Sequence, residues 1–223
     1  MINIQKAFSY PFEDKEWPVK ILIGTLLSFI PVINFFSQGY SYRVLKGILN
    51  DKEFSMPDWD DWGKLFIEGF IVFLIGFCYY FIPIVLTFVG IIAAIVGVDN
   101  IDEYSRGGGL LLGGVFSILI GIFLLLAAMV LYPMALANYI KNGERFGAAL
   151  RLQEIIPNIF KVMGEYVVAI ILMCSIYFVI ILFSFIPFVG ILFSLLQLVL
   201  HFYIFYLLWV ALFGTACSGA YID

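Results

Sequence analysis

The chain is dominated by long apolar stretches in which no charged residue occurs. Four segments contain no Asp, Glu, Lys or Arg: 21–42, 69–98, 107–140 and 166–222. A helix that crosses a bilayer needs about 20 predominantly apolar residues. Each segment is therefore long enough to cross, and the last is long enough to cross twice. The pattern predicts an all-α polytopic transmembrane helix bundle that forms one integral membrane domain over residues 1–223.

Helix breakers inside these segments divide them into about six predicted spans. Residues 30–34 (IPVIN) and 186–190 (IPFVG) each interrupt an apolar run. Proline disfavours helix at the residue before it, and Gly or Asn accepts turn geometry, so we expect both to be tight hairpins at the outer surface. The predicted spans are 19–35, 36–49, 65–98, 107–140, 161–186 and 188–218.

The stretch 83–121 leaves the number of spans open. Pro83 lies about 28 Å along a helix from Lys64, which is roughly one membrane thickness, so we expect it at the outer surface. Residues 84–98 would then form a kinked extension, an interfacial helix or a re-entrant segment. The alternative has eight spans, because 107–140 is split near Gly121, and it also keeps both termini on one side.

A Phe-Ile-Pro motif that begins at residues 29, 81 and 185 indicates an internal repeat. The pairs Lys64/Glu68 and Lys161/Glu165 open the second and third units at a spacing that places both members on one helix face. We predict three parallel helical-hairpin repeats, each preceded by an interfacial helix. Their expected limits are 1–50, 55–142 and 143–223.

Composition and charge agree with a membrane location and indicate its orientation. The chain is 63% hydrophobic and 13% charged, whereas about 25% of the residues in a soluble domain are charged. Cytoplasmic loops are rich in Lys and Arg, and every basic residue except Arg106 lies in segments that can share one side. We expect a multi-pass protein of the cell (plasma) membrane with cytoplasmic N- and C-termini. The net charge of −4 gives no basic face for nucleic acid.

Amphipathic and tryptophan-rich segments predict contacts with the cytoplasmic interface. Apolar residues recur every three or four positions in 144–161 and lie opposite a polar face, as in interfacial helices. Trp17, Trp59 and Trp62 are expected to be interfacial anchors, because Trp is enriched at membrane–water boundaries. Asp58 is expected to cap a helix that starts beside them.

Polar residues in or beside the spans are the candidates for chemistry. Gln197 and His201 lie one turn apart in the last span, and with Glu68 and Glu165 they form a candidate intramembrane polar site. The competing interpretation is that these side chains only fix helix packing. The sequence contains no readable catalytic set, phosphate-binding loop or metal-ligand spacing. We therefore expect a protein that is not an enzyme and has no cofactor or metal.

Small residues at every fourth position of the fourth span predict a helix-packing stripe. Its members are Gly109, Gly113, Ser117 and Gly121. In lipid, small side chains let two helices approach closely. The partner is either another helix of this chain, a second copy, or another membrane protein.

Motifs in the first third of the chain carry a family resemblance. They are FSYPF at 8–12 with Asp14, Trp17 and Lys20, then Gly39-Tyr40 with Arg43, and PDWDDWG at 57–63. These motifs resemble a family of prokaryotic membrane proteins known as domain of unknown function 4013 (DUF4013). The resemblance implies a multi-span membrane protein and provides no catalytic residue, cofactor or activity to carry over.

Two functions follow as expectations. The first is a non-enzymatic scaffold, assembly factor or partner subunit that acts by helix packing in the lipid bilayer, as a homo-oligomer or with another membrane protein. The second is a small-solute or ion transporter or channel, which repeat symmetry and proline-interrupted spans would suit. An intramembrane enzyme that acts on lipids is a weaker third, because no catalytic set is visible.

Overall fold

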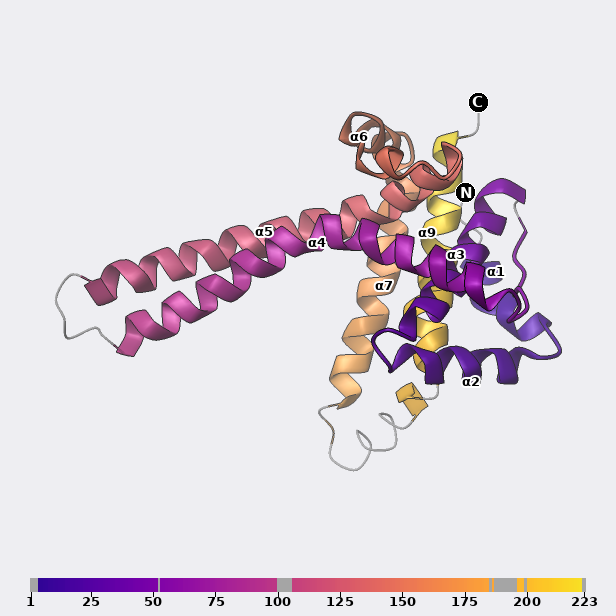
Figure 1. Ribbon diagram of the computed structural model, residues 1–223, viewed down its shortest axis with the longest axis horizontal. Coiled ribbons are helices and arrows are strands. Elements are labelled where there is room, and N and C mark those ends of the chain that lie inside the picture. The colour runs from indigo at the N-terminus through magenta and orange to yellow at the C-terminus, as the bar shows by residue number, and fades with distance from the viewer. Residues whose placement is uncertain are drawn as a thin grey trace. The chain divides into compact units, whose positions relative to one another are not determined.

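The computed structural model describes residues 4–51, 53–99, 106–184, 186, 196–198 and 200–221. All regular structure in these ranges is helical (Figure 1), which confirms the predicted all-α class. The chain divides into two compact units. Unit 1 comprises Met1–Phe73 and Pro133–Asp223, and unit 2 comprises Leu74–Tyr132.

Four helices in the described ranges are long and apolar enough to cross a membrane. They are α4 (Trp62–Asp99), α5 (Arg106–Lys141), α7 (Met163–Ser184) and a helix over Leu200–Tyr221. The last one contains a π-helical turn, η3 (Tyr203–Leu208), followed by α9 (Trp209–Ser218) and η4 (Gly219–Tyr221). Their length and apolar composition are consistent with the predicted multi-span membrane protein.

The N-terminal part of unit 1 contains α1 (Ile4–Ser9), η1 (Tyr10–Glu13), α2 (Trp17–Ser28) and α3 (Asn34–Asp51). The turn predicted at 30–34 joins α2 to α3, and within it the Asn34 N–H donates to the Ile30 carbonyl at 2.7 Å. However, α2 has only 12 residues, or about 18 Å, and it runs across the direction of α7 and α9 (Figure 1). The first two predicted spans therefore correspond to a hairpin whose first helix is shorter than the bilayer core.

The core of unit 1 is built around α3, which packs against α2 and α9. Tyr40 and Ile48 of α3 are almost completely buried. Where α3 crosses the start of α4, a Cβ on Gly39 would lie 2.0 Å from the Leu65 carbonyl oxygen, and one on Gly69 would lie 1.8 Å from that of Phe35. No side chain fits at these distances, so this crossing requires glycine on both helices.

The C-terminal part of unit 1 is an antiparallel helix pair. Tyr166 at the start of α7 packs against Phe213 of α9 with ring centroids 5.5 Å apart, and Tyr177 further along α7 packs against Phe205 at 5.3 Å. The connection includes the turn predicted at 186–190, which lies outside the described residues except for Ile186. The short helices η2 (Phe146–Leu150) and α6 (Leu152–Lys161) precede α7, and Figure 1 shows α6 across the end of α7 and α9.

In unit 2 both long helices continue without interruption. Helix α4 continues through Pro83 to Asp99, and α5 continues through Gly121, so Pro83 does not end a helix and the split required for eight spans is absent. Membrane helices tolerate an internal proline where neighbouring groups compensate for it. Here α5 supports α4 at the proline, because a Cβ on Gly121 would lie 3.1 Å from the Pro83 carbonyl oxygen. The second Phe-Ile-Pro motif is therefore not a hairpin turn.

The two helices of unit 2 touch through glycines that are seven residues apart. On α4 these are Gly90 and Gly97, and on α5 they include Gly114 and Gly121. A Cβ added to Gly90 would lie 2.8 Å from the Gly114 carbonyl oxygen, and one added to Gly97 would lie 2.4 Å from the Leu111 nitrogen. A Cβ added to Gly121 would lie 2.2 Å from Thr87 Oγ1. Backbone therefore lies against backbone along this helix pair.

This geometry changes the predicted four-residue stripe. Residues seven apart drift only about 20° around a helix, whereas residues four apart drift about 40°, or about 120° over three steps. Ser117 faces α4 and donates to the Leu86 carbonyl at 2.8 Å, and Gly121 also contacts α4. Gly109 and Gly113 face away from α4, because among the described residues nothing beyond their chain neighbours and the local backbone of α5 lies within 4 Å of a Cβ built on either. Only half of the stripe packs against α4.

Two glycines of α5 that face different surroundings test this arrangement directly. A Cβ on Gly114 would lie 2.5 Å from the Ala94 nitrogen. Gly114→Leu should therefore destabilise the helix pair by about 1–3 kcal/mol, because overpacking forces the two backbones apart. Gly108→Leu adds the same side chain to a glycine of α5 that faces open space and should leave stability unchanged. Thermal unfolding in detergent compares the two variants, and equal stability of both would contradict the heptad contact.

Candidate functional site

The polar groups of unit 1 gather around the loop that joins α3 to α4. Its described residues, 53–61, carry the acidic and tryptophan-rich motif noted in the sequence. Helix α2 contributes Lys20 and helix α3 contributes Tyr40 and Arg43 to this site, which we call the loop clamp. The loop and these two helices bring together residues that are far apart in sequence, such as Trp59 and Lys20, which are separated by 39 positions.

Lys20 is the first fastening of the loop clamp. Although charged, it is only 6% exposed, and its Nζ lies 2.7 Å from both Asp14 Oδ2 and Asp58 Oδ1. It also donates to the Met56 carbonyl at 3.3 Å. The hydrogen bond from Lys20 lowers the pKa of the Asp14 carboxyl below 3.8, its ordinary value, so the pair is charged at neutral pH. A buried ammonium needs such partners, because an unpaired buried charge is costly.

Arg43 is the second fastening. Its Nε donates to Glu68 Oε2 at 2.7 Å, and its Nη1 donates to Asp60 Oδ1 at 2.9 Å. The Glu68 side chain is 11% exposed, and Lys64 Nζ lies 4.0 Å from Glu68 Oε1, which is a long distance for an ion pair. The predicted partner of Glu68, Lys64, is thus secondary, and the principal partner comes from another helix. Arginine suits this position because its planar fork can hold two carboxylates at once.

Aromatic stacking completes the loop clamp. The Trp59 ring stacks on Tyr40 with centroids 4.3 Å apart and planes at 25°. Trp62 also stacks on Trp59, with centroids 5.8 Å apart. Trp59 Nε1 donates to the Lys20 carbonyl at 3.2 Å, and Tyr40 Oη donates to that of Pro57 at 2.7 Å. Both the side chains and the backbone of the loop are therefore held by contacts with α2 and α3.

The tryptophans predicted to be interfacial anchors have different environments. Trp59 is half-buried inside unit 1, Trp62 is 44% exposed, and Trp17 is half-buried with its ring edge-to-face against Phe12 at 5.0 Å. Their contact with a membrane interface stays a prediction. The predicted cap residue was wrong by three positions: Asp61 rather than Asp58 caps α4, and its Oδ1 accepts from the Lys64 N–H at 3.4 Å.

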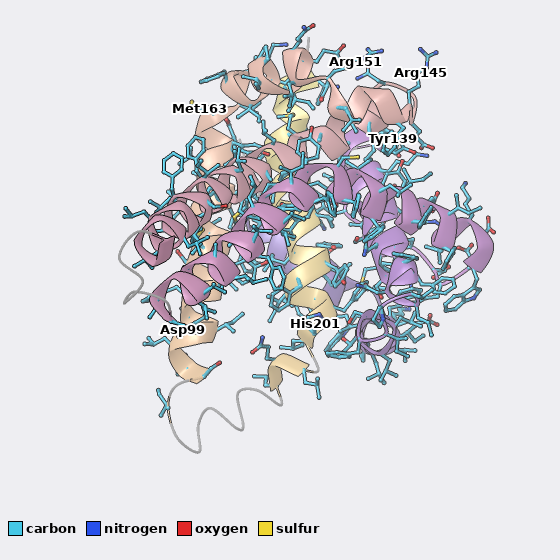
Figure 2. All side chains as sticks on the ribbon, turned by 60° about the vertical axis from the view of Figure 1, so that its left-hand side comes forward. Asp99, Tyr139, Arg145, Arg151, Met163 and His201 are labelled. Carbon is cyan, nitrogen blue, oxygen red and sulfur yellow. The ribbon has the colours of Figure 1, made fainter. Side chains whose placement is uncertain are left out.

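The predicted polar site of the last span has aromatic surroundings. His201 packs against Phe29 at 5.1 Å, Phe205 at 4.7 Å and Tyr206 at 6.1 Å, measured between ring centroids. Gln197 is half-buried one turn before it, and Glu165 is half-buried in the first turn of α7. Figure 2 shows His201 toward one end of unit 1, whereas Met163, the first residue of α7, lies toward the other.

A polar pocket that sequence reasoning missed lies between α5, α6 and η4. Its volume is about 490 Å³, and we call it the α6 pocket. Asn138, 1% exposed, donates through Nδ2 to the Ala148 carbonyl at 2.8 Å and to Glu154 Oε2 at 3.0 Å, while Tyr221 Oη donates to Asn138 Oδ1 at 3.1 Å. A lone Asn inside a charge-free apolar segment is the signal that could have indicated it. The lining residues are Asn138, Lys141, Asn142, Glu154, Pro157, Asn158, Lys161, Ala220 and Tyr221.

Comparison with known protein families identifies the family to which the chain belongs. The sequence model of the family described as "Protein of unknown function (DUF4013)" matches residues 23–189, which is more than half of the 223-residue chain. The protein belongs to the DUF4013 family. This confirms the predicted resemblance. No curated protein and no solved structure matches the chain.

The DUF4013 match covers most of the loop clamp. It includes Arg43, Glu68 and the whole loop 53–61, and it starts after Lys20 and Asp14. It also covers unit 2 and α6. In this DUF4013 protein, Lys20 of α2 is paired with Asp14 and Asp58, and Arg43 of α3 is paired with Asp60 and with Glu68 of α4. These ion pairs connect the three helices to one another and to the loop.

Removal of the Lys20 ion pairs should destabilise the loop clamp. Lys20→Met leaves the Asp14 carboxylate, whose side chain is 22% exposed, without its cation, and we expect the free energy of unfolding to fall by about 2–4 kcal/mol. Lys15→Met removes an equal charge from an exposed position and should change stability by less than about 0.5 kcal/mol. Thermal unfolding in detergent, followed by tryptophan fluorescence, measures both. Equal stability of the two variants would show that the Lys20 ion pairs do not stabilise the fold.

Proposed function

We propose that this DUF4013 protein is a non-enzymatic membrane scaffold, assembly factor or partner subunit that acts by helix packing. The observation that carries the proposal is the bare backbone at Gly109 and Gly113. Unit 2 already buries its heptad glycines, yet these two leave open space on another face of α5. They lie among large exposed apolar side chains, including Leu112 at 73% and Phe116 at 65% exposure. A second transmembrane helix could approach α5 closely there.

The charged groups of unit 1 support the same proposal. Lys20 and Arg43 are paired with the loop carboxylates Asp58 and Asp60. His201 packs among aromatic rings, which suits a side chain that fixes packing. A protein whose polar groups hold its own helices together is suited to binding other helices.

We also propose the location and topology. The protein lies in the plasma membrane of a prokaryotic cell as a multi-pass protein with both termini in the cytoplasm. Clustered basic residues support this orientation, and Figure 2 shows Arg145 and Arg151 at the same end of unit 1 as Met163. The proposed six-span arrangement counts α2 and α3 with the four long helices. Four and six crossings both place the termini on the same side.

Purification from native membranes in mild detergent tests the packing function. Wild type and Gly108→Leu should retain a stoichiometric second copy or another membrane protein, and Gly113→Leu should lose it. Gly108 is the matched control, because it also faces open space but lies about 140° around the helix from Gly113. Mass spectrometry and light scattering measure the complex. A solitary monomer in all three preparations, or equal complexes in all three, would refute the proposal.

Transport of a small solute or ion is the second candidate. It is favoured by polar side chains near His201, where Tyr206 Oη donates to Asn34 Oδ1 at 2.6 Å. If the protein transports, liposomes containing it should show a flux that His201→Ala and Glu165→Ala both reduce. The measurement is ion or solute flux against protein-free liposomes. Flux that equals this background in wild type would exclude transport of the solutes tested.

A further inference from the structure

The α6 pocket is the polar feature that the packing function does not use. All of its lining residues belong to unit 1, and they come from the end of α5, from α6 and from the C-terminal turn. Its volume of about 490 Å³ falls within the ordinary range of small-molecule sites. Two ammonium groups, three amides and a phenol line it, so its chemistry suits a compact anion.

The charges of the two lysines in the pocket are not cancelled by its single carboxylate. Glu154 accepts from Arg151 Nη1 at 3.0 Å and from Asn138 Nδ2 at 3.0 Å. These bonds, the one from Asn138 first, lower its pKa, so it is a carboxylate already paired with Arg151. Lys141 Nζ donates to the Leu49 carbonyl at 2.6 Å, which is a neutral acceptor.

Lys161 is the more accessible of the two lysines. It is exposed at the end of α6, and the described part of the chain gives it no hydrogen bond or ion pair. An ammonium at the mouth of a polar pocket, with no carboxylate bound to it, is an available ligand for an anion.

The opposite face of α6 is apolar and exposed. Ile156 is 41% exposed, Phe160 is 63% exposed, and Met163 just beyond the helix is 48% exposed. A short helix with one apolar and one polar face is suited to the boundary between headgroups and acyl chains. Basic pockets on the cytoplasmic side of membrane helices bind anionic lipid headgroups. The α6 pocket therefore opens where headgroup phosphates would be found.

We propose that the α6 pocket binds a phosphate group through Lys141 and Lys161. Phosphate is carried either by the headgroup of an anionic phospholipid or by a free phosphate ion. Asn142 also lines the pocket, but its Nδ2 already donates to the Asn138 carbonyl at 2.9 Å and to Asn138 Oδ1 at 3.0 Å. The phosphate would therefore bind to the two lysines. The exposed apolar face of α6 would accommodate acyl chains when the source is a lipid.

Native mass spectrometry of the full-length protein in detergent tests the proposal, with phosphatidylglycerol as the anionic probe and phosphatidylcholine as the zwitterionic one. Wild type should bind the first phosphatidylglycerol more tightly than phosphatidylcholine. Lys161→Gln and Lys141→Gln should each weaken it about fivefold. Lys15→Gln removes an exposed charge outside the pocket and should bind like wild type. Because the residues that the structure describes give Lys161 no hydrogen bond or ion pair, its variant tests binding without a change in folding.

Addition of inorganic phosphate separates the two sources. Displacement of phosphatidylglycerol by phosphate assigns the site to the phosphate group itself, and binding that resists phosphate assigns it to the lipid headgroup. Equal phosphatidylglycerol binding by wild type and Lys161→Gln would overturn the proposal. An equal loss in Lys15→Gln would also overturn it, as would equal binding of the two lipids.

Discussion

Backbone contact between helices at glycine is the constraint on which both units depend. In lipid the hydrophobic effect does not drive one apolar helix onto another, so association rests on van der Waals contact and hydrogen bonds. Dispersion weakens steeply with separation, and glycine permits the closest approach. In unit 1, Gly39 and Gly69 let α3 cross α4. In unit 2, Gly90 and Gly114 do the same for α4 and α5.

The loop clamp solves a different problem, which is how a polar helix can occupy the centre of an apolar unit. Helix α3 carries Arg43 and several hydroxyl and amide groups, yet many of its residues are buried. The acidic loop brings Asp58 to within 2.7 Å of Lys20 and Asp60 to within 2.9 Å of Arg43. Without the loop, both cations would lose partners at the edge of a low-dielectric interior, where an unpaired charge is most costly. Helix packing and charge pairing therefore depend on each other in unit 1.

The two ends of unit 1 differ in chemistry. The end near His201 is aromatic, while the end near α6 carries the exposed arginines and the polar pocket (Figure 2). Such polarity suits a protein whose basic end faces the cytoplasm. The charged residues of this end lie just beyond the apolar segments.

The sequence alone was sufficient for the helical membrane class, the turn at 30–34 and the family, because these depend on local composition and on short motifs. Charge-free segments report the solvent that surrounds a helix, and a Pro-Asn turn reports backbone preference. The predicted role of Lys64 as the partner of Glu68 followed the same local logic. It became secondary because Arg43 on another helix lies closer to Glu68.

Only the tertiary structure decided which face of α5 packs. Gly109, Gly113, Ser117 and Gly121 look like one stripe in the sequence, but a four-residue period winds around the helix, and only its later part meets α4. Pro83 likewise looks like a helix end, yet α4 continues through it beside Gly121. The α6 pocket depends on Asn138 and Tyr221, which are far apart in the chain. A sequence pattern states which residues can pack or turn, and the neighbouring helix determines which of them do.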